Sequence, residues 1–497
     1  MSVTWTQEQQ KVIELRNRNI LVSAAAGSGK TAVLVERIIK MLTAQENPID
    51  VDRLLIVTFT EAAAAEMKER IREAVEKELE VQPENVHLQR QATLIHSAQI
   101  TTIHSFCLSV IREHFHVIDM DPGFRIAEEG ELKLLKQDIL EGLLEEEYEK
   151  GEKDFLAFTE KYSSGRSDRK IEELILKLYE YACSYPQPEK WLQECTEAYH
   201  LEAAKDEAGN KEGAEVFEKA KKQVKKYLFD ISETQKQALL LCQEADGPYM
   251  YASMLESDIE GLEEALKAET FEAVSGKIKG LAWKRLSPKK DDSVSEEKKE
   301  QVKNMRERVK KQVNKLKEMF FYDAAEEQML DMQKTYGSVQ ILVDLVCRFA
   351  KAFAEAKRSR NVIDFHDMEQ SALAILTEEK DGVLCPSEAA KEYQEQFVEV
   401  MIDEYQDSNY VQELILTSIS RTDPPNLFMV GDVKQSIYRF RLARPELFME
   451  KYETYTKEES THQKIELHQN FRSRKSVLDS VNFFFYQLMH KAVGNVE

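Results

Sequence analysis

A turn rich in glycine and alanine lies between two apolar segments and has the composition of a phosphate-binding loop. The preceding run 19–23 suits a buried parallel strand, and the residues from Thr31 onward favour a helix. Backbone N–H groups of such a turn, with the positive end of the helix, attract nucleotide phosphates. Lys30 can reach the β- and γ-phosphates, and the Thr31 hydroxyl can ligate Mg²⁺. We therefore predict a nucleotide site formed by Ala24, Ala25, Ala26, Gly27, Ser28, Gly29, Lys30 and Thr31.

One departure from the usual pattern leaves an alternative open for this turn. The spacing G-x-x-x-x-G-K-[ST] has glycine at its first position, where this chain has Ala24. A short Gly/Ala turn is also common as a plain connection between a strand and a helix. The strand–turn–helix context makes the phosphate site the better interpretation.

A pair of carboxylates follows a second apolar segment far along the chain. Residues 396–402 predict a strand, and Asp403 and Glu404 come directly after it. A carboxylate at a strand end can hold Mg²⁺, and its neighbour can accept a proton from an attacking water. We assign Asp403 to the metal and Glu404 to the general base. An acidic surface loop is the alternative in a chain this acidic, but the upstream phosphate loop makes it the weaker one.

A third segment, 431–441, combines a polar side chain with aromatic rings. Gln435 is followed by Tyr438 and Phe440, whose rings can stack on nucleic-acid bases. Stacking tolerates any base and contributes about 1–3 kcal/mol per base, which suits a protein that moves along a strand of any sequence. Ordinary core packing is the alternative for the two rings.

These segments, in this order, resemble the motifs of superfamily 1A DNA helicases of the UvrD/RecB type. They are most similar to the AddA branch, the helicase–nuclease subunits of bacterial double-strand-break processing, and Lys434 in place of a common acidic residue favours that branch. The resemblance covers the chain from Thr6 to Ser473. Its ordered segments are 6–9 (Q-motif), 27–31 (motif I), 57–67 (motif Ia), 102–106 (motif Ic), 403–407 (motif II), 431–441 (motif III) and 467–473 (motif IV).

The resemblance implies an ATP-dependent DNA helicase with ATP and Mg²⁺ as cofactors. Gln9 would read the adenine edge, and Phe471 would stack on the adenine. Gln435 would sense the γ-phosphate and couple it to DNA, and Arg472 would reach that phosphate. A lone histidine on an apolar segment is often structural, so the role of the histidine in motif Ic stays open. The implied single-stranded DNA contacts are Phe59, Thr60, Thr102, His104, Tyr438 and Phe440.

The same resemblance implies partners and a cellular location. Single-stranded and double-stranded DNA ends are the expected substrates, an AddB-like protein is the expected partner in a heterodimer, and the cytoplasm is the expected location. Nothing after Ser473 matches motifs V and VI or a RecB-type nuclease domain, so we expect the N-terminal part of a longer polypeptide. The alternative is a module that binds nucleotide and single-stranded DNA without turnover on its own.

An α/β fold is needed to position these residues. We expect a P-loop RecA-like domain with a parallel sheet, a large all-helical insertion (subdomain 1B) and the start of a second RecA-like domain. Strand and helix signals alternate over residues 1–121 and return over 361–452, which are the expected halves of domain 1A. Residues 122–360 are rich in Glu, Lys, Leu and Ala and form the expected insertion, and residues 453–497 begin the expected, truncated domain 2A.

The charge of the chain limits how it can bind DNA. A formal net charge of −22 over 497 residues requires a local basic groove for phosphate contacts. Residues 277–317 contain 15 Lys or Arg against 6 Asp or Glu, and apolar residues recur there at helical spacing. We predict an amphipathic helix whose outer face contacts DNA or is simply solvated, with Lys303, Arg306, Lys310 and Lys317 on that face.

Two other classes of protein are disfavoured. No run approaches the roughly 20 apolar residues of a membrane span, so no membrane association is expected. The six cysteines are dispersed without a C-x-x-C pair, which predicts reduced thiols rather than a zinc or iron–sulfur site.

Overall fold

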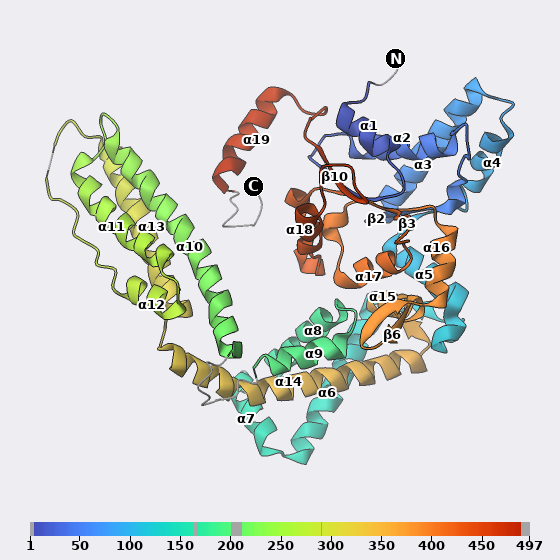
Figure 1. Ribbon diagram of the computed structural model, residues 1–497. Helices are drawn as coiled ribbons and strands as arrows, with labels where there is room; N and C mark the ends of the chain where they lie inside the picture. The colour runs from blue at the N-terminus through green and yellow to red at the C-terminus, as the bar shows by residue number, and fades with distance from the viewer. Residues whose placement is uncertain (1–3, 164, 166, 200–210, 290, 489–497) are drawn as a thin grey trace. The chain divides into compact units, whose positions relative to one another are not determined.

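The computed structural model describes residues 4–163, 165, 167–199, 211–289 and 291–488 (Figure 1). The chain divides into two compact units. The first comprises Met1–Gln193 and Ile341–Leu478, and the second comprises Glu194–Gln340 and Asp479–Glu497. Within the described ranges, every helix is too short or too polar to cross a bilayer.

The first unit is built on a six-stranded sheet in which every strand pair is parallel. Because helices cover both faces, its central strands are mostly apolar and do not alternate between apolar and polar residues. Three of these strands are buried at every position. The predicted α/β fold with a parallel sheet is confirmed. The order across the sheet is β10 (His462–Leu467), β1 (Asn19–Ala24), β9 (Leu427–Gly431), β8 (Glu399–Ile402), β2 (Leu54–Thr58) and β3 (Gln99–Thr102).

Helices lie on both faces of the sheet (Figure 1), and an apolar core on each face holds them in place. One face is covered by α1 (Gln7–Glu14), α2 (Lys30–Leu42), α3 (Glu61–Val81) and α4 (Val86–Leu94). The other is covered by α5 (Ile103–His114), α15 (Phe365–Leu376), α16 (Glu388–Gln396), α17 (Tyr410–Ser418) and α18 (Pro445–Thr454). A hairpin of β6 (Thr377–Lys380) and β7 (Val383–Pro386) joins α15 to α16.

The strand before the carboxylate pair is shorter than predicted. It begins at Glu399 rather than at residue 396, because Ser387 caps a helix that continues to Gln396. Glu399 is buried in the strand and forms an ion pair with Arg37 of α2. Of the run 396–402 that predicted a strand, only residues 399–402 therefore form one.

The segment between the two halves of the sheet leaves the sheet core and returns to it at one place. The two-residue strands β4 (Arg125–Ile126) and β5 (Val362–Ile363) pair in parallel. Arg125 N–H donates to Asn361 C=O at 3.1 Å, and Ala127 N–H donates to Ile363 C=O at 2.9 Å. The helices that follow β4 are α6 (Glu129–Lys150), α7 (Lys153–Tyr162), α8 (Arg169–Cys183) and α9 (Pro188–Glu197), and α14 (Ala325–Ser359) precedes β5.

The described part of the expected insertion is helical apart from β4, and its helices divide between the two units. The domain boundaries themselves stay a prediction. Strand β10 lies in the range 453–497 that we assigned to the start of a second domain, yet it is an edge strand of the first sheet. The helix α19 (Lys475–Leu488) follows it, and a second RecA-like domain remains a prediction.

The second unit is a helical bundle whose ion pairs correct one sequence-based expectation. Arg306, predicted on an outer helix face, is only 2% exposed. Its Nε lies 2.6 Å from the Asp258 carboxylate because the neighbouring helix brings that residue inside, and a buried guanidinium requires such a partner. The bundle helices are α10 (Lys211–Gln243), α11 (Ala252–Lys267), α12 (Phe271–Lys279) and α13 (Glu296–Phe320).

Candidate nucleotide and nucleic-acid sites

The phosphate-loop candidate has the backbone that its glycines allow. Gly27 and Gly29 have φ angles of +74° and +82°, a region that other residues rarely adopt. A Cβ on Gly27 would lie 2.7 Å from Asn470 Nδ2, so a larger residue would clash there as well. Gly29 is the N-cap of α2, which places Lys30 and Thr31 in the first turn of that helix. Position 24 carries no such demand, because Ala24 is the last, buried residue of β1 and pairs with Leu467.

The predicted lysine and the predicted base meet although they are far apart in the chain. Lys30 Nζ lies 3.1 Å from both carboxylate oxygens of Glu404. Glu404 follows β8 with a φ of +52°, so the chain turns sharply at this residue as it leaves the strand. The carboxyl ends of parallel strands share one edge of the sheet, which explains why α2 and the end of β8 converge.

Three carboxylates are crowded at this edge. Burial, and then the charge of Glu404, raise the pKa of Asp403 to about 6, although Lys30 opposes the shift. The same two causes raise the pKa of Asp407 to about 6. Asp407 Oδ1 is buried and has no hydrogen-bond partner within the described part of the chain. The site therefore has more negative charge than Lys30 alone can balance and fits a cationic ligand.

A chain of hydrogen bonds connects Glu404 to the predicted sensor Gln435. Gln406 Nε2 donates to Glu404 at 2.9 Å, and its Oε1 accepts from Asp432 N–H at 2.9 Å. The Asp432 carboxylate in turn accepts from Gln435 Nε2 at 2.9 Å. Gly431 makes room for this chain, because any Cβ there would overlap Gln406. Gln406 and Asp432 were not predicted as connecting residues, although both lie inside the segments that match motifs II and III.

The predicted adenine residues line one small cavity. Gln9 and Phe471 border a space of about 140 Å³ together with Ser28. The Gln9 amide donates to Ser28 C=O at 3.2 Å, and its oxygen closes a capping box with Thr6 at the start of α1. Phe471 is 61% exposed, so its ring is open to a ligand.

The structure does not bring the Arg472 side chain beside the carboxylates of the predicted nucleotide site. Its side chain is exposed, and its backbone N–H donates to Asn470 Oδ1 at 2.9 Å. Over the described residues, no ion pair joins its guanidinium to Glu404 or Asp403. The Asn470 side chain instead covers the phosphate loop by donating to Ala26 C=O at 2.6 Å. Contact between Arg472 and a phosphate stays a prediction.

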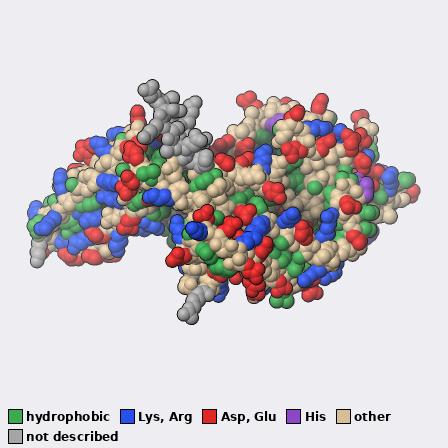
Figure 2. All heavy atoms as spheres, turned by 90° about the horizontal axis from the view of Figure 1, so that it is seen from below, with side chains coloured by type: hydrophobic (Ala, Val, Ile, Leu, Met, Phe, Trp, Pro, Cys, Tyr) green, Lys and Arg blue, Asp and Glu red, His purple; other side chains and the backbone are tan. Residues whose placement is uncertain are grey.

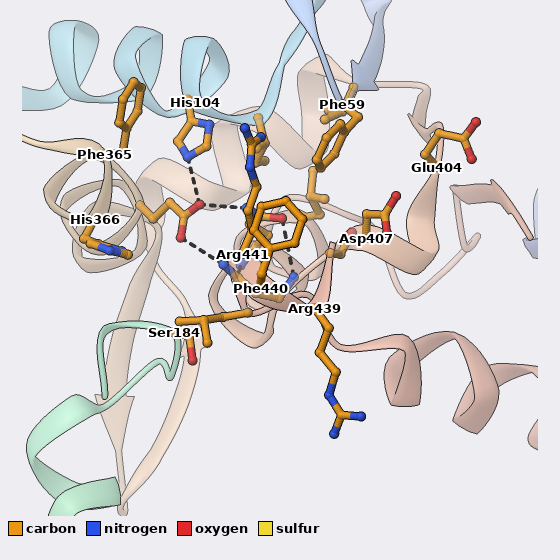
Figure 3. Close-up of a pocket in the computed structure, with 18 of the residues that line it drawn as sticks. Phe59, His104, Ser184, Phe365, His366, Glu404, Asp407, Arg439, Phe440 and Arg441 are labelled. Atoms are coloured by element: carbon orange, nitrogen blue, oxygen red, sulfur yellow. Dashed lines mark hydrogen bonds and ion pairs between the residues drawn. The ribbon is translucent and has the colours of Figure 1, made fainter. Parts of the chain in front are cut away.

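A larger cavity of about 830 Å³ adjoins the carboxylates (Figure 3). Phe59, His104 and Phe440 line it, as do Glu404 and Asp407. Figure 3 shows the aromatic side chains and the carboxylates around this one space. The structure thus brings three of the predicted DNA contacts to the wall of a cavity that reaches the nucleotide site.

Two residues of this wall, Phe59 and Phe440, belong to a continuous strip of aromatic rings that Tyr438 completes. The ring centroid of Tyr438 lies 4.4 Å from that of Phe59 and 5.8 Å from that of Phe440. The guanidinium of Arg441 lies 5.6 Å from the Tyr438 ring and 5.7 Å from the Phe59 ring. Phe440 is 76% exposed, so its ring is open to a ligand. The strip has the features of a surface on which bases stack.

The two predicted threonine contacts already have structural roles. Thr60 caps α3 by accepting from Ala63 N–H, and Thr102 caps α5 by accepting from Ser105 N–H. The Thr102 hydroxyl also donates to Glu61 at 2.7 Å. Their contact with DNA stays a prediction.

Several cations of the basic segment 277–317 form ion pairs. Lysines on α13 pair with glutamates three residues away, and Lys298 pairs with Glu244 and Asp246. Lys277 pairs with Glu264 at 2.6 Å. On the face seen in Figure 2, basic and acidic side chains are interspersed. The segment therefore has the charge pattern of a solvated helix face more than that of a phosphate-binding surface.

Comparison with known proteins gives one consistent result. The profile of the UvrD/REP helicase N-terminal domain matches residues 5–456. A Lachnoclostridium phytofermentans protein, named as a subunit of an ATP-dependent helicase/nuclease, is 51% identical over 99% of this chain and 36% of its own length. Proteins with the same name from Bacillus licheniformis and Clostridium beijerinckii are 45% and 43% identical over 99% of this chain. The chain spans 36–40% of the length of these curated relatives.

Proposed function

Because this chain belongs to the UvrD/REP helicase family, we propose that it is the ATP-hydrolysing N-terminal part of a DNA helicase subunit. One observation carries the proposal. Hydrogen bonds connect Glu404, which pairs with Lys30, to Gln435, and the aromatic strip begins three residues after Gln435. This arrangement lets a change at the phosphates reach a surface on which bases stack.

The nucleotide site fits ATP with Mg²⁺. Its oxygen donors, the Thr31 hydroxyl and the Asp403 carboxylate, are of the kind that Mg²⁺ prefers, and the excess negative charge beside Lys30 requires a cation. Mg²⁺, when bound, neutralises charge on the β- and γ-phosphates. Lys30 binds those phosphates, and Glu404 accepts the proton of the attacking water. Gln9 and Phe471 hold the adenine in their cavity.

Acidification is expected to weaken Mg²⁺-dependent nucleotide binding. The pKa of Asp403 is raised to about 6, so the carboxyl gains a proton as pH falls through 6, and only the ionised form ligates a metal. Between about pH 7.5 and about pH 5.5 the ionised fraction of Asp403 falls to roughly one quarter. We therefore expect the Mg²⁺ concentration for half-maximal nucleotide binding to rise about fourfold. Titration of Mg²⁺ against a fluorescent ATP analogue at both pH values measures this, and Asp403→Asn should reduce the pH dependence to the part contributed by Asp407. An equal Mg²⁺ requirement at both values would contradict the assignment.

We place the single-stranded DNA in the 830 Å³ cavity, with bases on the strip of Phe59, Tyr438 and Phe440. The curated relatives are named helicase/nuclease subunits, which supports an assembly on broken DNA ends with a second, AddB-like protein. The cytoplasm, where bacterial DNA is processed, is the corresponding location. In such an assembly, ATP binding and hydrolysis would alternately tighten and release the strand.

Tyr438→Ala is expected to weaken single-stranded DNA binding by about 1–3 kcal/mol, the contribution of one stacked base. Tyr438 packs on Phe59 at 4.4 Å and stands at the centre of the strip, so its loss interrupts the stacking surface. Fluorescence anisotropy with a labelled oligo(dT) strand measures the affinity. Tyr322→Ala removes an exposed tyrosine of the helical bundle and serves as the control. If the Tyr438→Ala protein and the wild type bind oligo(dT) with equal affinity, Tyr438 does not stack on a base and has only a packing role.

Phosphate release with and without oligo(dT) tests the proposal as a whole. In a polypeptide of the relatives' full length we expect stimulation of about fivefold or more. Absence of stimulation there would overturn the helicase assignment. The same assay on the 497-residue chain addresses a second candidate, a module that binds nucleotide and DNA without turnover, which the partial coverage of the relatives favours.

A further inference from the structure

Glu369 is a buried carboxylate outside the helicase motifs that reaches the wall of the large cavity. We propose that Glu369 is a positioning residue that fixes His104 at this wall and connects it to the segment 403–407, so that a bound strand is sensed by a second route besides Gln435. The inference rests on the proposed function, because it assumes that DNA occupies the cavity.

The contacts of Glu369 are specific and complete. Its side chain comes from α15, is 4% exposed, and accepts from His104 Nε2 at 3.1 Å. Asn409 Nδ2 donates to it at 3.1 Å and Gln412 Nε2 at 2.7 Å. A buried carboxylate is strongly unfavourable without such partners. Three donors from two other helices therefore converge on one acceptor.

The electrostatics agree with an ionised Glu369. Burial raises its pKa, but the hydrogen bond and charge of His104, with the amides of Gln412 and Asn409, outweigh burial and hold the pKa below its usual value. Removing the charge would weaken the acceptor that the His104, Asn409 and Gln412 donors share.

His104 is oriented by this bond and by one ring. Its Nε2 faces Glu369, and its ring meets the Phe365 ring edge-on at 5.1 Å between centroids. The imidazole is partly exposed and lines the cavity together with Phe440. Because Nε2 is bound to Glu369, Nδ1 is the ring nitrogen left for a strand in the cavity. A carboxylate that fixes a histidine tautomer and ring orientation is a known physical device in binding sites.

The other side of the network reaches the nucleotide site. Asn409 caps α17, and Gln412 completes a capping box with it, so both amide oxygens are used in the helix start while both amide nitrogens bind Glu369. Asn409 lies two residues after Asp407, which also lines the cavity and has a buried oxygen without a partner among the described residues. A shift of His104 toward a strand would pull on Glu369 and hence on the start of α17. The displacement would pass to the turn that carries Glu404.

Glu369→Gln in the full-length protein with its partner tests the inference. Glutamine has nearly the same size as glutamate, but it replaces one of the two acceptor oxygens with an NH₂ group. That NH₂ group opposes the donor on its side of the network. We expect the maximal stimulation of phosphate release by oligo(dT) to fall about fivefold or more, while the oligo(dT) concentration for half-stimulation changes less. Glu147→Gln is the matched control, since Glu147 is also buried and ion-paired, with Arg348, but is not among the residues that line the cavity. It should be stimulated like the wild type.

A double variant separates this role from general damage. If Glu369 acts through His104, then Glu369→Gln combined with His104→Ala should lose no more stimulation than His104→Ala alone. His104→Ala changes a partly exposed side chain and keeps the inference testable if Glu369→Gln does not fold. Full stimulation of either single variant would overturn the inference. Lack of stimulation in the wild type would instead defeat the proposed function itself.

Discussion

Glu404→Gln is expected to slow phosphate release by about 10²–10⁴-fold while nucleotide remains bound. The amide has nearly the shape of the carboxylate and can still lie beside Lys30 and Gln406, which contact Glu404 at 3.1 and 2.9 Å. It cannot accept the proton of the attacking water. Single-turnover phosphate release measures the rate, and equilibrium binding of a fluorescent ATP analogue measures retention of the nucleotide.

Glu413→Gln is the matched control for this experiment. Glu413 is also paired with a lysine, Lys451, and accepts from the hydroxyl of Tyr405, which directly follows Glu404. Its carboxylate is used by these two partners and not by Lys30, so hydrolysis should remain close to the wild-type rate. Normal turnover by the Glu404→Gln protein would show that Glu404 is not the general base. Asp403 and Asp407 would then be the remaining candidates at that edge of the sheet.

Lys30→Ala is expected to weaken ATP binding by about 1.5–3 kcal/mol, or about 10- to 150-fold, the contribution of hydrogen bonds to a charged group. Lys30 is the cation beside Asp403, Glu404 and Asp407, and its loss also leaves those carboxylates to repel the phosphates. Equilibrium binding of a fluorescent ATP analogue to a full-length protein measures the change.

Lys40→Ala provides the comparison, because Lys40 lies on the same helix and its ion pair with Glu14 is on the surface. Exposed ion pairs contribute about 0–1 kcal/mol, so this variant should bind ATP like the wild type. Tight ATP binding by the Lys30→Ala protein would exclude the loop 24–31 as the phosphate site.

Local signals explain why much of the fold could be predicted. The buried runs 19–23 and 54–58 are strands, and the residues after each begin a helix, because apolar continuity and turn chemistry act over a few neighbouring residues. The strand before Asp403 was predicted three residues too long, since α16 continues to Gln396 and Phe397 is its C-cap. Apolar periodicity alone does not detect where a helix ends.

Contacts between distant segments explain what the sequence could not show. His104 and Glu369 meet only because α5 and α15 pack on the same face of the sheet. Nothing in the sequence around either residue indicates that the two are in contact. Arg306 was predicted to be exposed because its helix is basic, but Asp258 on another helix neutralises it inside the bundle. Side-chain partners of this kind follow from tertiary packing, whereas Lys30 and Glu404 could be predicted as site residues because the proposed chemistry requires fixed local neighbours.

The pairing of β4 with β5 has an evolutionary consequence. The chain leaves the core after Ile126 and returns at Val362, and two backbone hydrogen bonds hold these points side by side. An excursion whose ends are already adjacent can be lengthened, trimmed or exchanged without disturbing the register of the sheet. Loop closure adds little to the free energy of folding as such an excursion grows, because that term increases only with the logarithm of length. The sheet can therefore keep its register even if the segment inserted at this single point changes in length.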